Sequence, residues 1–392
     1  MKSYSILTDK LQFSTRMQRV CDQVEPRLLP YSFREGTRTS PLQPEDRNPF
    51  LDVFEEMPDK PMDVTQAHAI VRSWLVTPCL IYPDEAIVGI TRPNYPILEH
   101  FSWGIQAGEF SKTVKAMEDS PEKEHLQQVL YRMSPLSFSL VHDEGRKHID
   151  AERMNAVLSD FFMHPGGYQG HTIPSYSRLL EKGLDGMLEY INHCAKNATD
   201  STSMNLYESS RIIVQGMSQW LKQYADHARA LYAKEKNPRQ KGYYAAIAAN
   251  CDFVAHRKPE TLYQAVQLIW CLSLWDWVDC VGRVDQYLFP FFKKAAEEGD
   301  VIPAEDSIVS IMLKFRENGV HCVTIGGVDE NGSDATNELT FLILHILRRF
   351  HDTYPRTSVR IHNETPQSLL ELAVKLWSQG MSDPTVVSDE ML

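Results

Sequence analysis

The chain has 392 residues, of which 43% are hydrophobic and 23% are charged, close to ordinary soluble usage. This composition excludes a disordered tail, a collagen-like rod and a disulfide-stabilised miniprotein. Its 52 acidic and 40 basic residues give a formal net charge of −12, which argues against binding to nucleic acid, because that binding depends on clustered cations. The sequence has no apolar run of the ~18 residues that a membrane span needs, and its first residues hold no secretory signal.

The number and spacing of the cysteines indicate the redox compartment of the protein. There are seven, an odd number, and the sequence has no C-x-x-C pair. This pattern predicts a reduced, cytoplasmic protein rather than a disulfide framework or a zinc site.

The N-terminal part is predicted to be mostly helical. Residues 1–60 are polar and interrupted by prolines, which predicts an extended or partly helical lead-in on the surface. Residues 64–76 carry one apolar stripe and predict a helix, whereas residues 80–90 are strand-like with a Pro-Asp turn inside. Residues 112–133 predict one charged helix or a pair of helices, and further helices are predicted at residues 150–164, 175–195 and 206–235.

The C-terminal part changes from helices to alternating strands and helices. Residues 260–277 are apolar nearly all round and predict a buried helix, and another helix follows at residues 284–298. After these come predicted strands at residues 320–325, 357–362 and 385–388, with helices at 335–350, capped by Asp334, and from Thr365-Pro366 to about 380. This alternation predicts parallel β/α units, whose functional loops follow the carboxyl ends of the strands. Because the loop after residues 385–388 is missing, we expect residues 61–392 to form a truncated domain.

Three local patterns allow both a binding and a structural interpretation. Residues 329–334 resemble a calcium loop, but the glycine stands at the fourth position instead of the sixth, which favours a turn. Residues 142–148 are either a metal cluster or a solvated loop. Residues 166–171 are glycine-rich and are either a phosphate loop or an ordinary connection.

Two places carry polar groups where a site is possible. His171 lies at a helix entrance bounded by glycine and proline. It is either a ligand-binding residue or a structural one. In the strand at 357–362, Arg360 and His362 point to the face opposite Val359 and Ile361. They therefore face either a polar cavity or solvent at a sheet edge, since buried charges need partners.

Several segments, taken in order, resemble the motifs of the glycyl radical enzymes, the pyruvate formate-lyase-like superfamily. They are YPDEAIVG at 82–89 with EHFSW at 99–103, GHTIPSYSRLLEKG at 170–183 with Ser175 in place of an aspartate, GRVDQYLFP at 282–290, GG at 326–327 with DATNELT at 334–340, and RIH at 360–362. The resemblance covers roughly residues 65–392.

The resemblance implies a helix-rich α/β fold, the N-terminal half of a ten-stranded barrel made of two five-stranded halves. It also implies a cysteine that becomes a thiyl radical and a glycine that stores the radical, installed by a radical S-adenosylmethionine activase. None of the seven cysteines matches the thiyl position, so we expect both radical loops to lie beyond residue 392. We expect no catalytic residue, bound cofactor or metal in this chain. It should be inactive alone, completed by a C-terminal half or a companion chain, and dimeric when complete.

The resemblance also gives substrate-binding candidates. In strict pyruvate formate-lyases an arginine stands at the position of His171, and imidazole suits a hydroxyl better than a carboxylate. The chain therefore resembles the family's lyases and dehydratases of small polyols, amines or acids more than its formate acetyltransferases. Val278 or Asp279 matches a pocket-lining position, with the register open by one residue, and Arg360 and His362 match a barrel strand near the pocket.

Two alternatives remain at this point. The chain could be a catalytically dead, truncated relative that acts as an association module, or an unrelated, mostly helical binding protein. The motifs above favour the enzyme over both.

Overall fold

A computed structural model describes residues 11–27, 49–90, 114–128 (except 122, 125 and 126), 173–275 and 280–391 (except 321 and 353). The predicted helix at 150–164, part of that at 112–133, and the candidates His171, Val278 and Asp279 lie outside the described residues. The elements are α1 (Thr15–Val24), η1 (Glu25–Arg27), α3 (Pro49–Glu56), α4 (Met62–Val76), α10 (Tyr176–Ala195), α11 (Ser201–Lys234), α12 (Pro238–Val254), α13 (Leu262–Trp275), β1 (Cys280–Arg283), α14 (Val284–Tyr287), α15 (Phe289–Glu298), α16 (Ala304–Asn318), β2 (Cys322–Gly326), α17 (Glu338–Phe350), β3 (Thr357–Ile361), α18 (Gln367–Ser378) and β4 (Thr385–Ser388).

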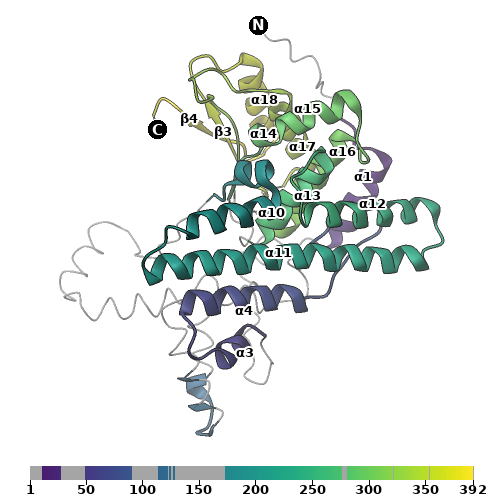
Figure 1. Cartoon of the computed structure of the whole chain (residues 1–392). Helices are drawn as coiled ribbons and strands as arrows, with labels where there is room; N and C mark the ends of the chain where they lie inside the picture. Colours follow the sequence, from purple (N-terminus) through teal and green to yellow (C-terminus); the bar gives the residue numbers. More distant parts are fainter. Residues whose placement is uncertain are drawn as a thin grey trace.

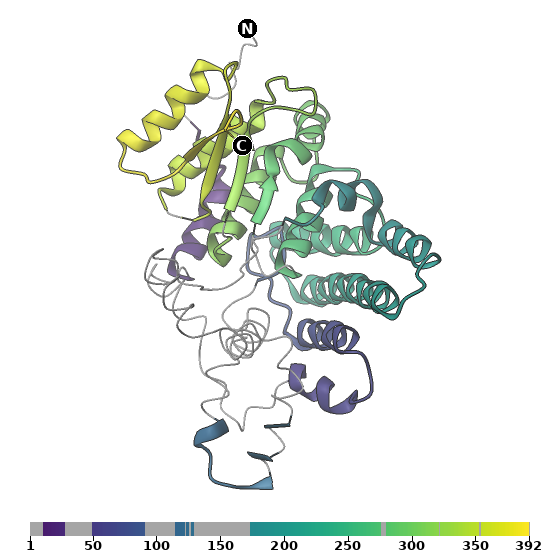
Figure 2. The ribbon, with the colours of Figure 1, turned by 90° about the vertical axis from the view of Figure 1, so that its left-hand side faces the viewer.

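A layer of long helices forms one side of the molecule (Figures 1 and 2). The 34-residue α11 packs against α4, α10 and α12, and this confirms the predicted helices at 64–76, 175–195 and 206–235. The start of α11 is fixed by Asp200, whose carboxylate accepts the backbone N–H of Ser203 at 2.8 Å. No helix in the described parts of the chain is long and apolar enough to cross a membrane.

Helix α13 lies between this layer and the sheet and confirms the prediction of a buried helix. Almost all of its side chains are buried, and it contacts α12, α15 and α16. Trp270 is fully buried, with its ring centroid 6.0 Å from that of Phe315 on α16. Because α13 is apolar nearly all round, it can join the two layers through a single hydrophobic core.

The prediction of a strand at residues 80–90 is wrong. The segment is irregular but buried from residue 84 onward, and side chains satisfy its backbone. Gln267 accepts the N–H of Val88 at 2.9 Å and donates to its carbonyl oxygen at 3.1 Å, and Trp270 Nε1 donates to the carbonyl oxygen of Gly89 at 3.0 Å. The N–H of Asp84 donates to the Gln240 side chain at 2.9 Å, and the Tyr263 hydroxyl donates to the carbonyl oxygen of Ala86 at 2.9 Å. Side chains of α12 and α13 thus take the place of a neighbouring strand.

The lead-in at 1–60 is partly helical in its described portion, in α1 and α3. One face of α1 is buried, and Met17 is 0% exposed. Polar contacts also bind α1 to the rest of the molecule, because Arg16 pairs with Asp306 of α16 at 3.3 Å and Arg19 pairs with Asp84 at 2.9 Å. This first helix is therefore part of the folded core.

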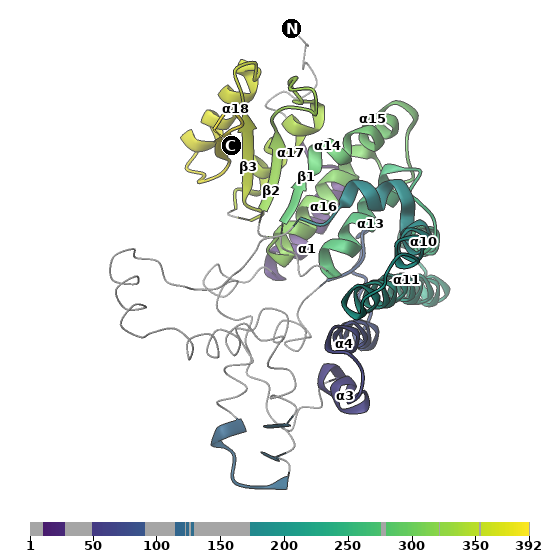
Figure 3. The same cartoon turned by 60° about the vertical axis from the view of Figure 1, so that its left-hand side comes forward.

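The sheet has four parallel strands in the order β1-β2-β3-β4 (Figure 3). Residue pairs such as Ile325↔Val359 and Val359↔Val386 fix the register. The connecting helices α16, α17 and α18 supply buried leucine, isoleucine and phenylalanine side chains, and Val323, Ile325 and Val359 of the strands are 0% exposed. The predicted parallel β/α units are therefore present, and β1 is a strand that the sequence pattern does not predict.

Two boundaries differ from the predictions. Asp334 does not cap the helix after β2, because that helix begins at Glu338 and Asn337 caps it in a reciprocal capping box with Thr340. The predicted helix at 284–298 is divided at Leu288 into α14 and α15, with Pro290 in the first turn of α15. Proline lacks the N–H that a continuous helix would need at this point, which explains the division.

Candidate functional site

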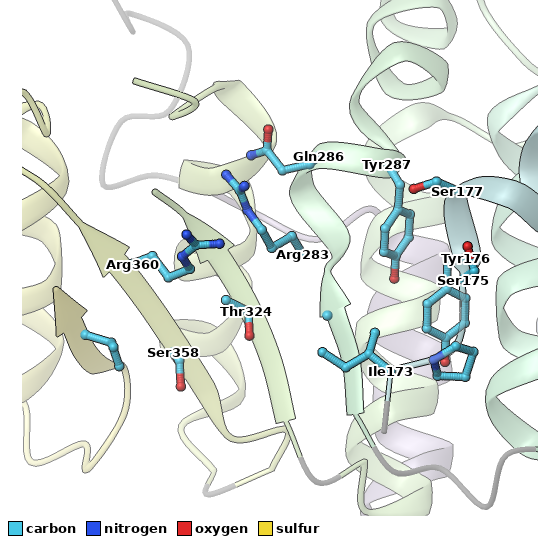
Figure 4. Close-up of a pocket in the computed structure, with 13 residues that line it drawn as sticks. Ile173, Ser175, Tyr176, Ser177, Arg283, Gln286, Tyr287, Thr324, Ser358 and Arg360 are labelled. Atoms are coloured by element: carbon cyan, nitrogen blue, oxygen red, sulfur yellow. The ribbon is translucent and has the colours of Figure 1, made fainter. Parts of the chain in front are cut away.

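A cavity of about 710 Å³ opens on the face of the sheet opposite α16, α17 and α18 (Figure 4). All four strands, α14 and the start of α10 contribute to it. Its lining residues are Ile173, Pro174, Ser175, Tyr176, Ser177, Gly282, Arg283, Gln286, Tyr287, Thr324, Ser358, Arg360 and Val387.

The sheet face in this cavity carries several polar side chains beside Val387 of β4. Thr324 of β2 and Ser358 and Arg360 of β3 point into the cavity, whereas Val323, Ile325 and Val359 between them point into the core. A parallel sheet that is covered on both faces normally carries apolar residues on both. Hydroxyl and guanidinium groups on one face are therefore unusual, and they give this cavity hydrogen-bonding groups beside its apolar lining.

Arg360 is held in place by an acidic partner. Its Nε donates to Asp389 Oδ1 at 2.6 Å, and Asp389 Oδ2 accepts the N–H of Val328 at 2.9 Å. Burial alone would raise the pKa of Asp389, but these hydrogen bonds outweigh it and hold the pKa below its ordinary value. Gly327 has a φ of +85°, and a Cβ there would lie 2.7 Å from Asp389 Oδ2, so the ion pair needs glycine at this position.

Arg283 lies at the top of the cavity near Arg360 (Figure 4). Its guanidinium donates to the carbonyl oxygens of Gly326 and Val328, at 2.6 and 2.7 Å. Burial lowers its pKa from the ordinary value, partly opposed by Asp285. Arg283 thus holds the loop after β2 and places a second positive charge beside the cavity.

Behind Arg283, buried hydrogen bonds connect α14 to the start of α17. Asp285 is 0% exposed, and its Oδ2 accepts the N–H of Gly326 at 2.9 Å and the hydroxyl of Thr340 at 2.5 Å. The side chain of Asn337 donates to the carbonyl oxygen of Asp285 at 3.0 Å. Burial raises the pKa of Asp285 to about 6. These contacts set the position of α14, and therefore of Arg283, relative to β2.

The start of α10 forms the side wall of the cavity. Tyr176 stacks on Tyr287 of α14, with ring centroids 5.4 Å apart, and Tyr287 donates to the carbonyl oxygen of Val281 at 2.9 Å. The helix is interrupted at Gly183, which has a φ of +66° and whose Cβ would lie 2.4 Å from Lys258 N. Glycine at this position lets α10 bend and pack closely against the backbone of Arg257 and Lys258.

Several residues that line the cavity belong to the motif segments that resemble the glycyl radical enzymes, at 170–183, 282–290 and 360–362. A comparison of the whole sequence with family models agrees with this resemblance. The model of the family described as "Pyruvate formate lyase-like" matches residues 29–392. The chain belongs to the pyruvate formate lyase-like family.

Relatives in this family include dehydratases and lyases. The chain is 26% identical to a probable dehydratase of Escherichia coli, YbiW, over 90% of this chain and 48% of that protein. It is 30% identical to an isethionate sulfite-lyase of Nitratidesulfovibrio vulgaris over 47% of this chain and 25% of that protein. The fold matches a structure from Roseburia inulinivorans concerned with 1,2-propanediol dehydration, with a TM-score of 0.75 and 23% identity, over 97% of this chain and 51% of that one. The chain therefore spans about half the length of the Escherichia coli protein and of the Roseburia inulinivorans protein.

The family's motif segments explain where the candidate residues lie. Arg360 lines the cavity as its strand position indicates, but His362 does not. His362 Nδ1 accepts the N–H of Glu364 at 3.3 Å, so that its Nε2 donates to Asp334 Oδ1, also at 3.3 Å. The structure thus assigns His362 a contact between two loops, while His171, Val278 and Asp279 lie outside the described residues.

Sequence reasoning did not select several residues that the structure places in the cavity. Arg283 and Gln286 belong to the GRVDQY motif, and Thr324 and Ser358 alternate with buried valines on their strands. The period of two along β2 and β3 was the available signal. The alternation does not identify which face of the sheet is open, because that depends on the positions of the helices that cover the other face.

Proposed function

We propose that this chain forms one wall of the substrate cavity of a glycyl radical dehydratase or lyase that acts on a small hydroxylated compound. The observation that carries the proposal is a cavity on one face of a parallel sheet, in a chain of this family, whose largely apolar lining carries a few hydroxyl and guanidinium groups. Its strand residues offer the hydroxyls of Thr324 and Ser358 and the guanidinium of Arg360. Hydroxyls pair with hydroxyls of a substrate, and a guanidinium stabilises an anionic group or a departing hydroxide.

The four strands belong, in this proposal, to one half of a ten-stranded barrel. In the described residues no strand pairs with the outer edges of β1 and β4. An unpaired edge of a parallel sheet favours the addition of another strand. Strands from outside residues 1–392 would continue the sheet and close the cavity.

The radical groups are proposed to come from outside these residues as well. In such an enzyme the thiyl radical, renewed from a glycyl radical made by an activase, removes a hydrogen atom from the substrate. The residues of this chain hold and orient the substrate, and Ile173, Tyr287 and Val387 help to exclude water from it. The chain alone is then inactive.

His171 provides the first test, in the complete enzyme together with its activase. We expect His171→Ala to lower kcat/KM for a small vicinal diol about tenfold, because one hydrogen bond to a substrate hydroxyl contributes ~1 kcal/mol or slightly more. The assay is anaerobic release of the aldehyde product. The matched control is His193→Ala, since His193 is exposed on α10.

Unchanged turnover in His171→Ala would remove His171 from the site. Absence of dehydration or carbon–sulfur cleavage of any small hydroxylated substrate by the activated complete enzyme would overturn the proposed function itself.

A further inference from the structure

Two cysteines lie next to each other on the open face of the sheet. Cys280 of β1 and Cys322 of β2 are directly paired in the register of these parallel strands. Cys322 stands two residues before Thr324, which lines the cavity, so its side chain points to that face. Cys280 is its register partner and points to the same face, ahead of a register shift in β1 between Cys280 and Arg283. Cys322 Sγ lies 3.9 Å from the Ser358 hydroxyl on β3. Cys322 is partly exposed and Cys280 is 9% exposed.

The surroundings of Cys322 favour its thiolate. The hydrogen bond from Cys280 is the largest influence and lowers the pKa of Cys322 to about 6, helped by Ser358 and Thr324 and opposed by burial and by Asp383 before β4. By contrast, burial raises the pKa of Cys21 and of Cys79 to about 11. Burial also raises the pKa of the fully buried Cys251 and Cys271.

The backbone geometry suits a disulfide bond. Paired residues on neighbouring strands have backbones ~4.8 Å apart, and disulfides join Cα atoms separated by ~4.4–6.8 Å. A bond between the two sulfur atoms therefore needs little movement of β1 or β2.

We propose that Cys322 is a peroxide-reactive modification site and that Cys280 is its resolving thiol. In the first step the Cys322 thiolate attacks hydrogen peroxide, which forms a sulfenic acid and releases hydroxide. In the second step the Cys280 thiol attacks this sulfur, the S–S bond forms, and the hydroxyl group leaves as water. The two thiols are oxidised by two electrons, and the peroxide is reduced to two waters. The resulting bridge lies on the same sheet face as the cavity, beside Ser358.

The test uses the 392-residue chain, reduced and then treated with limiting hydrogen peroxide. We expect an intact mass lower by two hydrogen atoms, and peptide mapping that joins Cys280 to Cys322. Cys322→Ser should abolish the mass change. In Cys280→Ser the sulfenic acid should persist on Cys322 and be trapped by dimedone.

Alkylation of the untreated chain needs no variant and gives a second readout. At pH 7 iodoacetamide should modify Cys322 about tenfold faster than Cys194, a partly exposed cysteine at the end of α10, and the Cys322 rate should level off above about pH 7. A bridge that joins other cysteines, no bridge at all, or equal rates at Cys322 and Cys194 would overturn the proposal.

Discussion

Arg360→Ala is expected to lower the free energy of unfolding by about 3 kcal/mol. The substitution would leave the Asp389 carboxylate buried without its cationic partner. This side chain is 5% exposed, and its remaining hydrogen bond would be the one from the N–H of Val328 at 2.9 Å. Removing one member of a buried ion pair typically costs ~3–5 kcal/mol, since the other charge is left uncompensated. Urea denaturation followed by tryptophan fluorescence measures the change.

The dependence on pH separates this cause from a general loss of packing. The pKa of Asp389 lies below its ordinary value of 3.8 in the folded wild type, so the stability that it contributes is present above that value and is lost as the pH falls through the lowered pKa. The stabilities of wild type and variant should therefore converge in acid. The matched control is Arg72→Ala, which removes an exposed pair with Glu56 at 2.7 Å and should leave stability nearly unchanged. Equal losses in the two variants would contradict the account of Arg360.

Asp285→Ala is expected to destabilise the protein by a similar amount, about 3 kcal/mol. It would leave the buried N–H of Gly326 and the hydroxyl of Thr340 without their acceptor and would open a cavity beside α14. Asp285→Asn keeps an oxygen for both donors and should cost much less. Urea denaturation at pH 8 compares the three proteins.

The Asn variant also tests the charge of Asp285. The pKa of this carboxyl is about 6 in the folded protein and 3.8 ordinarily, so the native state binds the proton more tightly than the unfolded state. Wild type should therefore gain stability relative to Asp285→Asn as the pH falls from about 6 to 4. A difference of about two pKa units corresponds to about 3 kcal/mol in total. If the two proteins show the same pH dependence, Asp285 is not the titrating group.

Hydrophobic periodicity predicts the helices of this protein well. Helix α13 is an example, because a stretch that is apolar nearly all round has no other favourable place than the core. The same reasoning fails at residues 80–90, where an apolar, strand-like stretch finds its hydrogen bonds in Gln267 and Trp270. Those partners lie far away in the sequence, so no local pattern identifies them.

The site was predictable only in part. The alternation in β3 places Arg360 opposite Val359, and this holds in the structure. It could not separate Arg360 from His362, because the alternation predicts the same face for both. In the structure β3 ends at Ile361, and His362 lies beside Asp334 while Arg360 lines the cavity. Cys280 and Cys322 are 42 positions apart in the sequence, and only the register of β1 and β2 brings them together.

The central claim is that these residues build the substrate-binding wall and that the radical groups belong to another part of the enzyme. The most direct measurement is electron paramagnetic resonance after anaerobic treatment with the activase, S-adenosylmethionine and a reductant. The complete enzyme, treated in parallel, should give the doublet of a glycyl radical, and the 392-residue chain alone should give none. A glycyl doublet from the chain alone would contradict the account.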